Sequence, residues 1–153
     1  MSNTQVQTYK KAGKNFISIH SKDILAGKTD SNAIFEEVMR NLPDPTLVYS
    51  DGCENKLDKD SSSFLEESKA IEKILSEVVE KAKTNGFNKF IVAGGETSGS
   101  AVIKLGYKSF YVGRSVAPGV PVLTPTEDES KRVILKSGNF GDESFFEKAL
   151  EAE

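Results

Sequence analysis

The sequence is poor in the residue types that build disulfides, metal sites and catalytic thiols. It contains one cysteine, Cys53, and one histidine, His20, among 153 residues. A single cysteine excludes an internal disulfide and a multi-cysteine metal site. A nucleophilic thiol needs a base such as histidine beside it, and one histidine near the end of a predicted strand is a poor basis for that pair. We therefore predict neither a metal site made only of protein side chains nor a catalytic cysteine.

Long apolar runs and an excess of positive charge are also missing. No run of about 18 apolar residues occurs, and the N-terminal stretch MSNTQVQTYKKAGK lacks a signal-peptide core. The 20 Lys and Arg are outnumbered by 23 Asp and Glu, which gives a net charge of -3. General nucleic-acid binders carry a basic surface instead. We expect a cytoplasmic protein that binds neither membranes nor nucleic acid.

What the chain does contain is typical of one ordinary globular domain. Its length of 153 residues, with 37% hydrophobic and 28% charged residues, fits a single domain over residues 1–153. Apolar residues alternate or cluster in short β-favouring runs, which predict strands. The predicted strands are 15–20, 46–50, 89–93, 109–113 and 132–137. Apolar residues at helical spacing predict helices at 4–12, 31–42, 63–85, 97–105 and 142–153.

Strands that alternate with helices indicate an α/β fold. We predict a three-layer sandwich, with a mostly parallel sheet and helices on both faces. In such folds ligands bind beyond the carboxyl ends of the strands. The loops after the strands are therefore the places to look for a site.

The first such loop is Gly94-Gly95-Glu96-Thr97-Ser98-Gly99, between a strand and a helix. Glycines let backbone N–H groups approach a ligand closely, and a helix start offers unpaired N–H groups and partial positive charge. This suits a phosphate, although the hydroxyls can equally cap the helix. The loop is neither a Walker A loop nor a dinucleotide loop, because its glycine spacing fits neither. The pattern alone leaves a plain turn and an anion cradle equally open.

Two further segments are rich in glycine or proline. KSGNFGDESFF, residues 136–146, again runs from a strand through glycines into a helix. If its strand neighbours that of the first loop, both loops line one crevice; otherwise Gly138 and Gly141 serve only the turn. APGVPVLTP, residues 117–125, predicts a type II turn at Pro118-Gly119 and a stiff surface loop, which is usually a connector and sometimes a wall of a ligand site. Lys136 and Arg114 are open between a phosphate contact and plain solvation.

In this order, AGGETSG, APGVP and LKSGNFG followed by FF resemble the carboxy-terminal nucleotide-binding domain of the four-carbon acid sugar kinase family. The resemblance is close over residues 88–150 and looser before them. It implies an ATP-dependent kinase of carbohydrate metabolism, in which this domain holds the nucleotide. A separate amino-terminal domain binds an acid sugar such as a tetronate. We expect that substrate domain to be absent from this chain.

The resemblance also implies which residues contact ATP. They are Gly94, Gly95, Glu96, Thr97 and Ser98 in the first loop and Gly138 in the second. A carboxylate at Glu96 would repel phosphates unless a cation intervenes, so Mg²⁺ is expected there. The resemblance indicates no catalytic base within this chain.

The sequence departs from the family in places. A Gly-Ser-Cys-Ser-like segment, which precedes the opening helix in the family and contacts the nucleotide, does not precede residue 4 here. Ser115 stands where the family often has an acidic residue, and TPTEDES (124–130) lacks the family's glycines. The departure at Ser115 puts any role of that acid in doubt.

These observations favour the ATP-binding domain of a kinase that transfers the γ-phosphate of ATP to a four-carbon acid sugar. We expect the isolated domain to be inactive, because the acceptor and its base would lie on the other domain. The alternative is a stand-alone nucleotide-binding regulatory module, or a partner subunit without catalysis of its own. An exposed apolar patch where the other domain would dock also makes a homodimer plausible.

Overall fold

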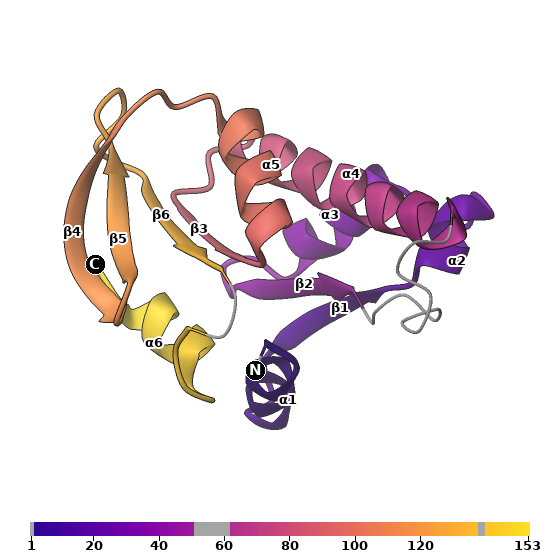
Figure 1. The fold of residues 1–153 in the computed structure, drawn as a ribbon, viewed down its shortest axis with the longest axis horizontal. Helices are drawn as coiled ribbons and strands as arrows, with labels where there is room; N and C mark the ends of the chain where they lie inside the picture. The colour runs from indigo at the N-terminus through magenta and orange to yellow at the C-terminus, as the bar shows by residue number, and fades with distance from the viewer. Residues whose placement is uncertain (1, 51–61, 138–139) are drawn as a thin grey trace. The chain divides into compact units, whose positions relative to one another are not determined.

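The fold was analysed in a computed structural model, which describes residues 2–50, 62–137 and 140–153. Helices and strands alternate along much of the chain (Figure 1). The helices are α1 (Ser2–Lys11), α2 (Ser21–Leu25), α3 (Ser31–Arg40), α4 (Ser62–Thr84), α5 (Gly95–Leu105) and α6 (Phe145–Glu151). The strands are β1 (Asn15–Ile19), β2 (Thr46–Ser50), β3 (Lys89–Ala93), β4 (Phe110–Ala117), β5 (Val120–Pro125) and β6 (Arg132–Lys136).

The chain divides into two compact units. Residues 14–78 form one unit, and residues 1–13 together with 79–153 form the other. The long helix α4 belongs to both, since its last turns lie in the second of these units. Each unit has its own sheet, and both predicted glycine loops belong to the unit that contains α5 and α6.

In the unit of residues 14–78, β1 and β2 pair in parallel, with Asn15 opposite Thr46. The connection between them includes α3, whose buried face carries Ile34, Phe35 and Val38 at helical spacing. A carboxylate caps this helix, because Asp30 accepts a hydrogen bond from the N–H of Ala33 at 2.8 Å. A strand–helix–strand unit therefore forms here as the apolar pattern predicts.

In the other unit a four-stranded sheet runs in the order β3-β6-β5-β4. β3 and β6 are parallel, whereas β5 is antiparallel to both β6 and β4. The α/β class is thus confirmed, but the mostly parallel sheet and the three-layer sandwich are not. The sheet is mixed because the chain reverses at Pro118-Gly119, where Gly119 has φ +80°, and pairs β4 with β5 as a hairpin.

The prediction that residues 117–125 form a connector is wrong, since Val120–Pro125 is strand β5. The prolines argued against a strand here, because proline has no N–H to donate to the hydrogen bonds between strands. In the structure Pro121 and Pro125 flank the two residues that pair with β6, namely Val122 and Leu123. The prolines thus lie outside that ladder, and the apolar residues between them form it.

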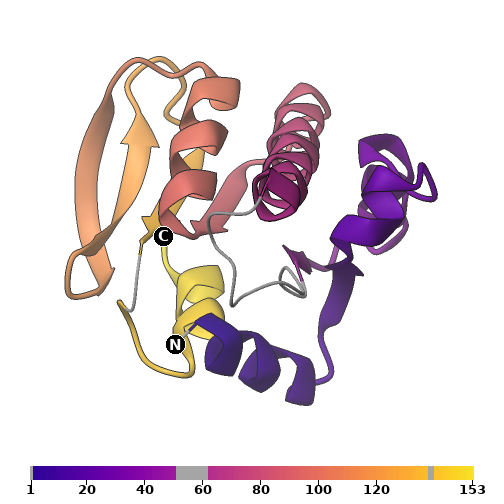
Figure 2. The ribbon, with the colours of Figure 1, turned by 45° about the vertical axis from the view of Figure 1, so that its right-hand side comes forward.

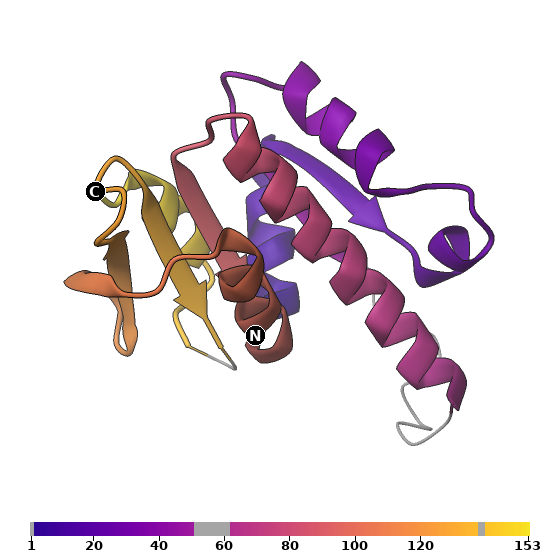
Figure 3. The ribbon, with the colours of Figure 1, turned by 90° about the horizontal axis from the view of Figure 1, so that it is seen from above.

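Helix α5 packs against β3 and β6, and α6 packs against β3 and β4 (Figure 3). Figure 2 shows α1 beside α6. The rings of Tyr9 and Phe146 pack edge to face, with 6.1 Å between their centroids. The core of the unit consists of buried apolar residues from α1, α5, α6 and the strands β3, β5 and β6. They include Val6, Tyr9, Phe90, Val92, Ala101, Leu105, Val120, Val122, Val133, Ile134, Phe145, Phe146 and Ala149. Burial of these side chains fixes the carboxyl ends of β3 and β6, where the glycine loops begin.

Candidate functional site

The parallel strands β3 and β6 end at the same edge of the sheet, with Ala93 opposite Lys136. Gly94 follows β3 and donates its backbone N–H to the carbonyl oxygen of Lys136 at 2.8 Å. Its φ of +111° is a conformation that side-chain-bearing residues rarely adopt. Glycine is therefore required at this position, and the chain turns here directly into α5.

The first turn of α5 leaves a defined set of backbone donors. The N–H of Ser98 closes the turn on the carbonyl oxygen of Gly94 at 2.8 Å. A helix provides no internal acceptors for its first N–H groups, which here belong to Gly95, Glu96 and Thr97. These donors lie at the positive end of the helix dipole. They form an arrangement suited to an anion.

The two hydroxyls of this turn differ in their surroundings. The side chain of Ser98 is only 8% exposed, and its Oγ lies 3.4 Å from the carbonyl oxygen of Lys136 and 3.5 Å from that of Val92. These are long contacts, but they direct the hydroxyl into the protein. Thr97 is half-buried, and its Oγ1 lies 3.4 Å from where a Cβ on Gly94 would be. Of the two, the hydroxyl of Thr97 is the one nearer the surface of the turn.

Helix α1 holds the second loop in place. Gln5 is fully buried, and its Nε2 donates to the carbonyl oxygens of Phe140 at 3.2 Å and Asp142 at 2.9 Å. Gly141, with φ +82°, lies against Phe145, where a Cβ would come within 2.8 Å of Cδ2. The start of the chain therefore shapes a loop near its other end. Sequence reasoning missed this contact, because no local pattern links a glutamine to a loop about 135 residues away.

The hairpin turn between β4 and β5 reaches the same loop. A Cβ at Gly119 would lie 3.1 Å from Cε1 of the Phe140 ring. The segments APGVP and NFG, which are far apart in the sequence, are thus in contact. Gly94 is hydrogen-bonded to Lys136, the residue just before the second loop. The loop after β3, the β4–β5 hairpin turn and the loop after β6 therefore lie at one edge of the sheet.

Lys136 ends β6 at this edge and is fully buried. Its Nζ lies 5.8 Å from the centroid of the Phe145 ring. Burial lowers the pKa of its amino group below the usual 10.5. Lys136 therefore does not face solvent.

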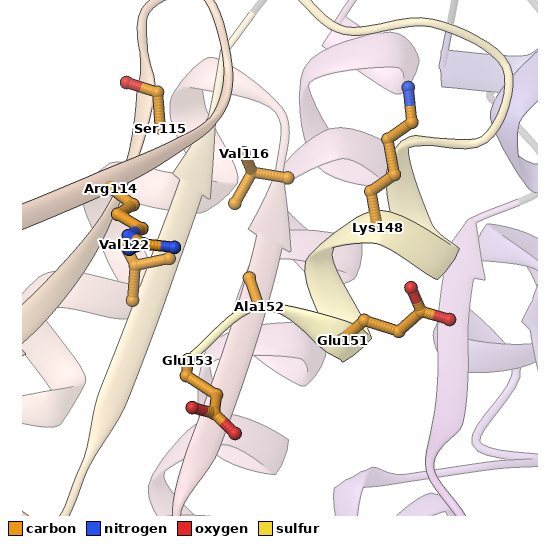
Figure 4. Close-up of a pocket in the computed structure, with 8 residues that line it drawn as sticks. All are labelled: Arg114, Ser115, Val116, Val122, Lys148, Glu151, Ala152 and Glu153. Atoms are coloured by element: carbon orange, nitrogen blue, oxygen red, sulfur yellow. The ribbon is translucent and has the colours of Figure 1, made fainter.

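Not every predicted residue can be placed. Gly138 lies outside the described residues, and so does the side chain of Glu96, so neither predicted contact is tested. Arg114 does not join the glycine segments. It lines a separate pocket of about 530 Å³ between the β4–β5 hairpin and the end of α6, together with Val116, Val122 and Ala152 (Figure 4). None of the predicted nucleotide contacts lines that pocket.

The described residues contain neither a metal-binding cluster nor a membrane-spanning helix. No group of three or more His, Cys, Asp or Glu gathers there in a way that could hold a metal ion. No helix among these residues has the length and apolar character needed to cross a membrane. The cysteine and all the acidic residues at 51–60 lie outside the described part.

Comparison with known proteins places this geometry in context. Residues 1–146 match the family described as the nucleotide-binding C-terminal domain. A 3-oxo-tetronate kinase from Actinobacillus succinogenes is 35% identical over 158 residues, covering 97% of this chain and 36% of that protein. A 3-oxo-tetronate kinase from Burkholderia multivorans is 38% identical over 114 residues, covering 73% of this chain and 27% of that protein.

A solved structure agrees with these matches. The crystal structure of Haemophilus influenzae protein HI1011 has a TM-score of 0.87 and 34% sequence identity, covering 98% of this chain and 37% of that chain. The chain thus spans only about a third of the length of the relatives that it matches over nearly all of its own residues.

Proposed function

This chain belongs to the family of nucleotide-binding C-terminal domains, and we propose that it binds ATP at the carboxyl edge of β3 and β6. The observation that carries the proposal is the turn at Gly94. This turn brings the N–H groups at the start of α5, which have no acceptor within the helix, to the edge of the sheet where the hairpin turn meets the second loop. Family membership supports a nucleotide phosphate as the anion.

The phosphates would lie on the first turn of α5. The N–H groups of Gly95, Glu96 and Thr97 would donate to phosphate oxygens, and the Thr97 hydroxyl would add a further donor. We assign Ser98 to this turn as a support, because its N–H and hydroxyl already lie against carbonyl oxygens. Gly94 provides the positive φ that lets the helix start here, and Gly138 remains a proposed contact from the second loop.

A magnesium ion suits the residues that this turn presents. Glu96 is the second residue of α5, so its carboxylate leaves the chain in the same turn as the proposed phosphate donors. A carboxylate so placed weakens phosphate binding unless a cation lies between them. Mg²⁺ commonly binds through one or two carboxylates plus phosphate oxygens, so Glu96 is the residue proposed to hold it. The ion would neutralise charge on the transferring phosphoryl group.

The reaction proposed for the whole protein is transfer of the γ-phosphate of ATP to an alcohol group of a four-carbon acid sugar. The names of the relatives support this, since they are 3-oxo-tetronate kinases. Catalysis of such transfers depends mainly on positioning and on charge stabilisation. This chain would contribute the nucleotide half, and the acceptor and its base would be held by residues outside it. We propose the cytoplasm as the location, because ATP is available there.

Calorimetry with MgATP tests the binding proposal. A side chain at Gly95 should obstruct phosphate at the helix start, so Gly95→Val should weaken binding at least about tenfold. Gly99 provides a matched control, because it lies in the same helix and a Cβ there would meet no atom within 4 Å. Gly99→Ala should bind MgATP like the wild type. Equal affinity of wild type and Gly95→Val would refute the placement of the phosphates.

A further inference from the structure

Lys136 is an unusual residue for its position. Its side chain is fully buried, and its neighbours in β6, Val133 and Ile134, are also fully buried but apolar. Lysine is among the residue types least often buried completely. An apolar side chain of similar size would fill the same space without the cost of desolvating a charge. Lysine at this point therefore adds a charge to the interior that an apolar residue would not.

We propose that Lys136 is a positioning residue of the nucleotide site, whose buried positive charge favours phosphates bound at the first turn of α5. This inference rests on the proposed function, since it assumes that nucleotide phosphates bind at that turn. It concerns the charge of Lys136 acting from behind the loops, and it requires no direct contact with the nucleotide.

The backbone of Lys136 forms part of the proposed phosphate turn. Its carbonyl oxygen accepts the N–H of Gly94 at 2.8 Å and lies 3.4 Å from Oγ of Ser98. A lysine side chain extends about 6 Å from its Cα, so the charge lies within about that distance of a residue whose main chain bonds to the turn.

The side chain of Lys136 extends toward the second loop. Its Nζ lies 5.8 Å from the Phe145 ring centroid, and Phe145 in turn lies against Gly141. One residue therefore joins the turn after β3 through its main chain and the region after β6 through its side chain. Loss of the side chain would remove the charge and leave the main-chain contact with the turn after β3 in place.

The surroundings of Lys136 make its charge effective. Charges in a protein interior are screened much less than charges in water. Burial disfavours the charged amine, and the negative face of the Phe145 ring offsets part of that effect. Bound phosphates would favour the charged form further. By reciprocity, the charged amine would strengthen phosphate binding by the same factor.

Lys136→Met tests the proposal against a matched control. Lys131 is also buried, at 8% exposure, and lies next to β6 at its opposite end, where its Nζ donates to the carbonyl oxygen of Phe87 and to Oδ1 of Asn88. Lys136→Met should weaken MgATP binding about tenfold, ADP binding less, and AMP binding only about twofold. Lys131→Met should leave all three affinities within about twofold of the wild type.

The dependence on nucleotide charge, read together with thermal unfolding, separates the electrostatic role from a structural one. If Lys136 acts through its charge, the loss of affinity in Lys136→Met should decrease from ATP to ADP to AMP, whatever the melting temperature of the variant. A lower melting temperature with equal losses for ATP, ADP and AMP would show that Lys136 merely shapes the loops. Unchanged ATP affinity in Lys136→Met would also overturn the proposal.

A measurement on the wild type covers the case in which Lys136→Met does not fold. The NMR signals of the lysine Cε groups can be followed while inorganic triphosphate is added. The signal of Lys136 should move and that of Lys131 should not. If the amide signals of Gly95 and Thr97 move while Lys136 does not, this inference fails and the proposed function stands. If neither moves and the wild type does not bind ATP, both fail.

Discussion

Gly119 lies against the ring of Phe140, so closely that a Cβ added to Gly119 would come within 3.1 Å of Cε1. Gly119 also has φ +80°, which is strained for any residue with a side chain. The hairpin turn and the loop after β6 therefore meet through a residue that has to be glycine on two grounds. This contact joins segments about 20 residues apart in the sequence into one rim of the proposed site.

The contact predicts a selective effect of Gly119→Ala. Alanine should cost about 1 kcal/mol from backbone strain and should displace the Phe140 ring. Both the melting temperature and the affinity for MgATP should fall. Gly27→Ala is the control, because Gly27 has φ +71° but no atom within 4 Å of its added Cβ. Gly27→Ala should lower the melting temperature similarly and leave MgATP affinity unchanged. Equal affinities for the two variants would argue against a role of this contact in binding.

Gln5→Met should destabilise the protein from a position in the first helix. It removes two hydrogen bonds and leaves the carbonyl oxygens of Phe140 and Asp142 without these donors. The cost should be about 2 kcal/mol, reduced somewhat because Gln5 Oε1, which has no partner within the described residues, is removed as well. Urea unfolding would measure this change. Gln7→Met, at an exposed position in the same helix, should change stability by less than about 0.5 kcal/mol.

Asp142 should contribute to the acid sensitivity of the fold. Hydrogen bonds from Lys148, at 2.6 Å, and from Ser144 hold the pKa of this carboxyl below its usual 3.8. The folded pKa is depressed, so the stabilisation is present above the unfolded pKa and is lost as pH falls through the folded one. Below about pH 4 the melting temperature of Asp142→Asn should thus fall less steeply than that of the wild type.

The partner of Asp142 provides the check on that cause. Lys148→Met removes the main donor and should flatten the acid limb of the curve in the same way. If the wild type and both variants lose stability in parallel below about pH 4, Asp142 has no part in the acid transition.

The 153-residue chain on its own should not phosphorylate an acid sugar. The relatives are about three times as long as this chain. We propose that the acceptor site lies in the part of them that this chain does not match. An assay for ADP formation with a tetronate acceptor should give no turnover above background ATP hydrolysis. A full-length 3-oxo-tetronate kinase serves as the positive control. Acceptor-dependent ADP formation by this chain would show that it contains a complete active site.

Sequence patterns predicted the parts of the fold that depend on local order. The strands at 46–50 and 89–93 have the bounds that apolar runs predict, and the helix of residues 97–105 starts only two residues earlier, at Gly95. Strand β5 could not be predicted in this way, because Pro121 and Pro125 signal a connector locally. Only its pairing with β6, through Val122 and Leu123, makes it a strand.

The candidate site shows the same division. Glycines at 94, 119 and 141 signalled turns, and each has positive φ in the structure. The residues that join these turns were not evident from the sequence. Gln5 and Lys136 act through burial and long-range contacts, and a polar residue on a short element gives no local signal of complete burial. Local patterns therefore indicated where the chain turns, and tertiary packing decided which polar residues hold the turns together.

The central claim is that nucleotide phosphates bind at the first turn of α5. The most direct test follows the backbone amide signals of the wild-type chain by NMR while MgATP is added. Saturable shifts should be largest at Gly95, Glu96 and Thr97, with smaller ones at Gly119 and Phe140. Saturable shifts confined to residues 14–78, or saturation without any change at Gly95, Glu96 and Thr97, would contradict it.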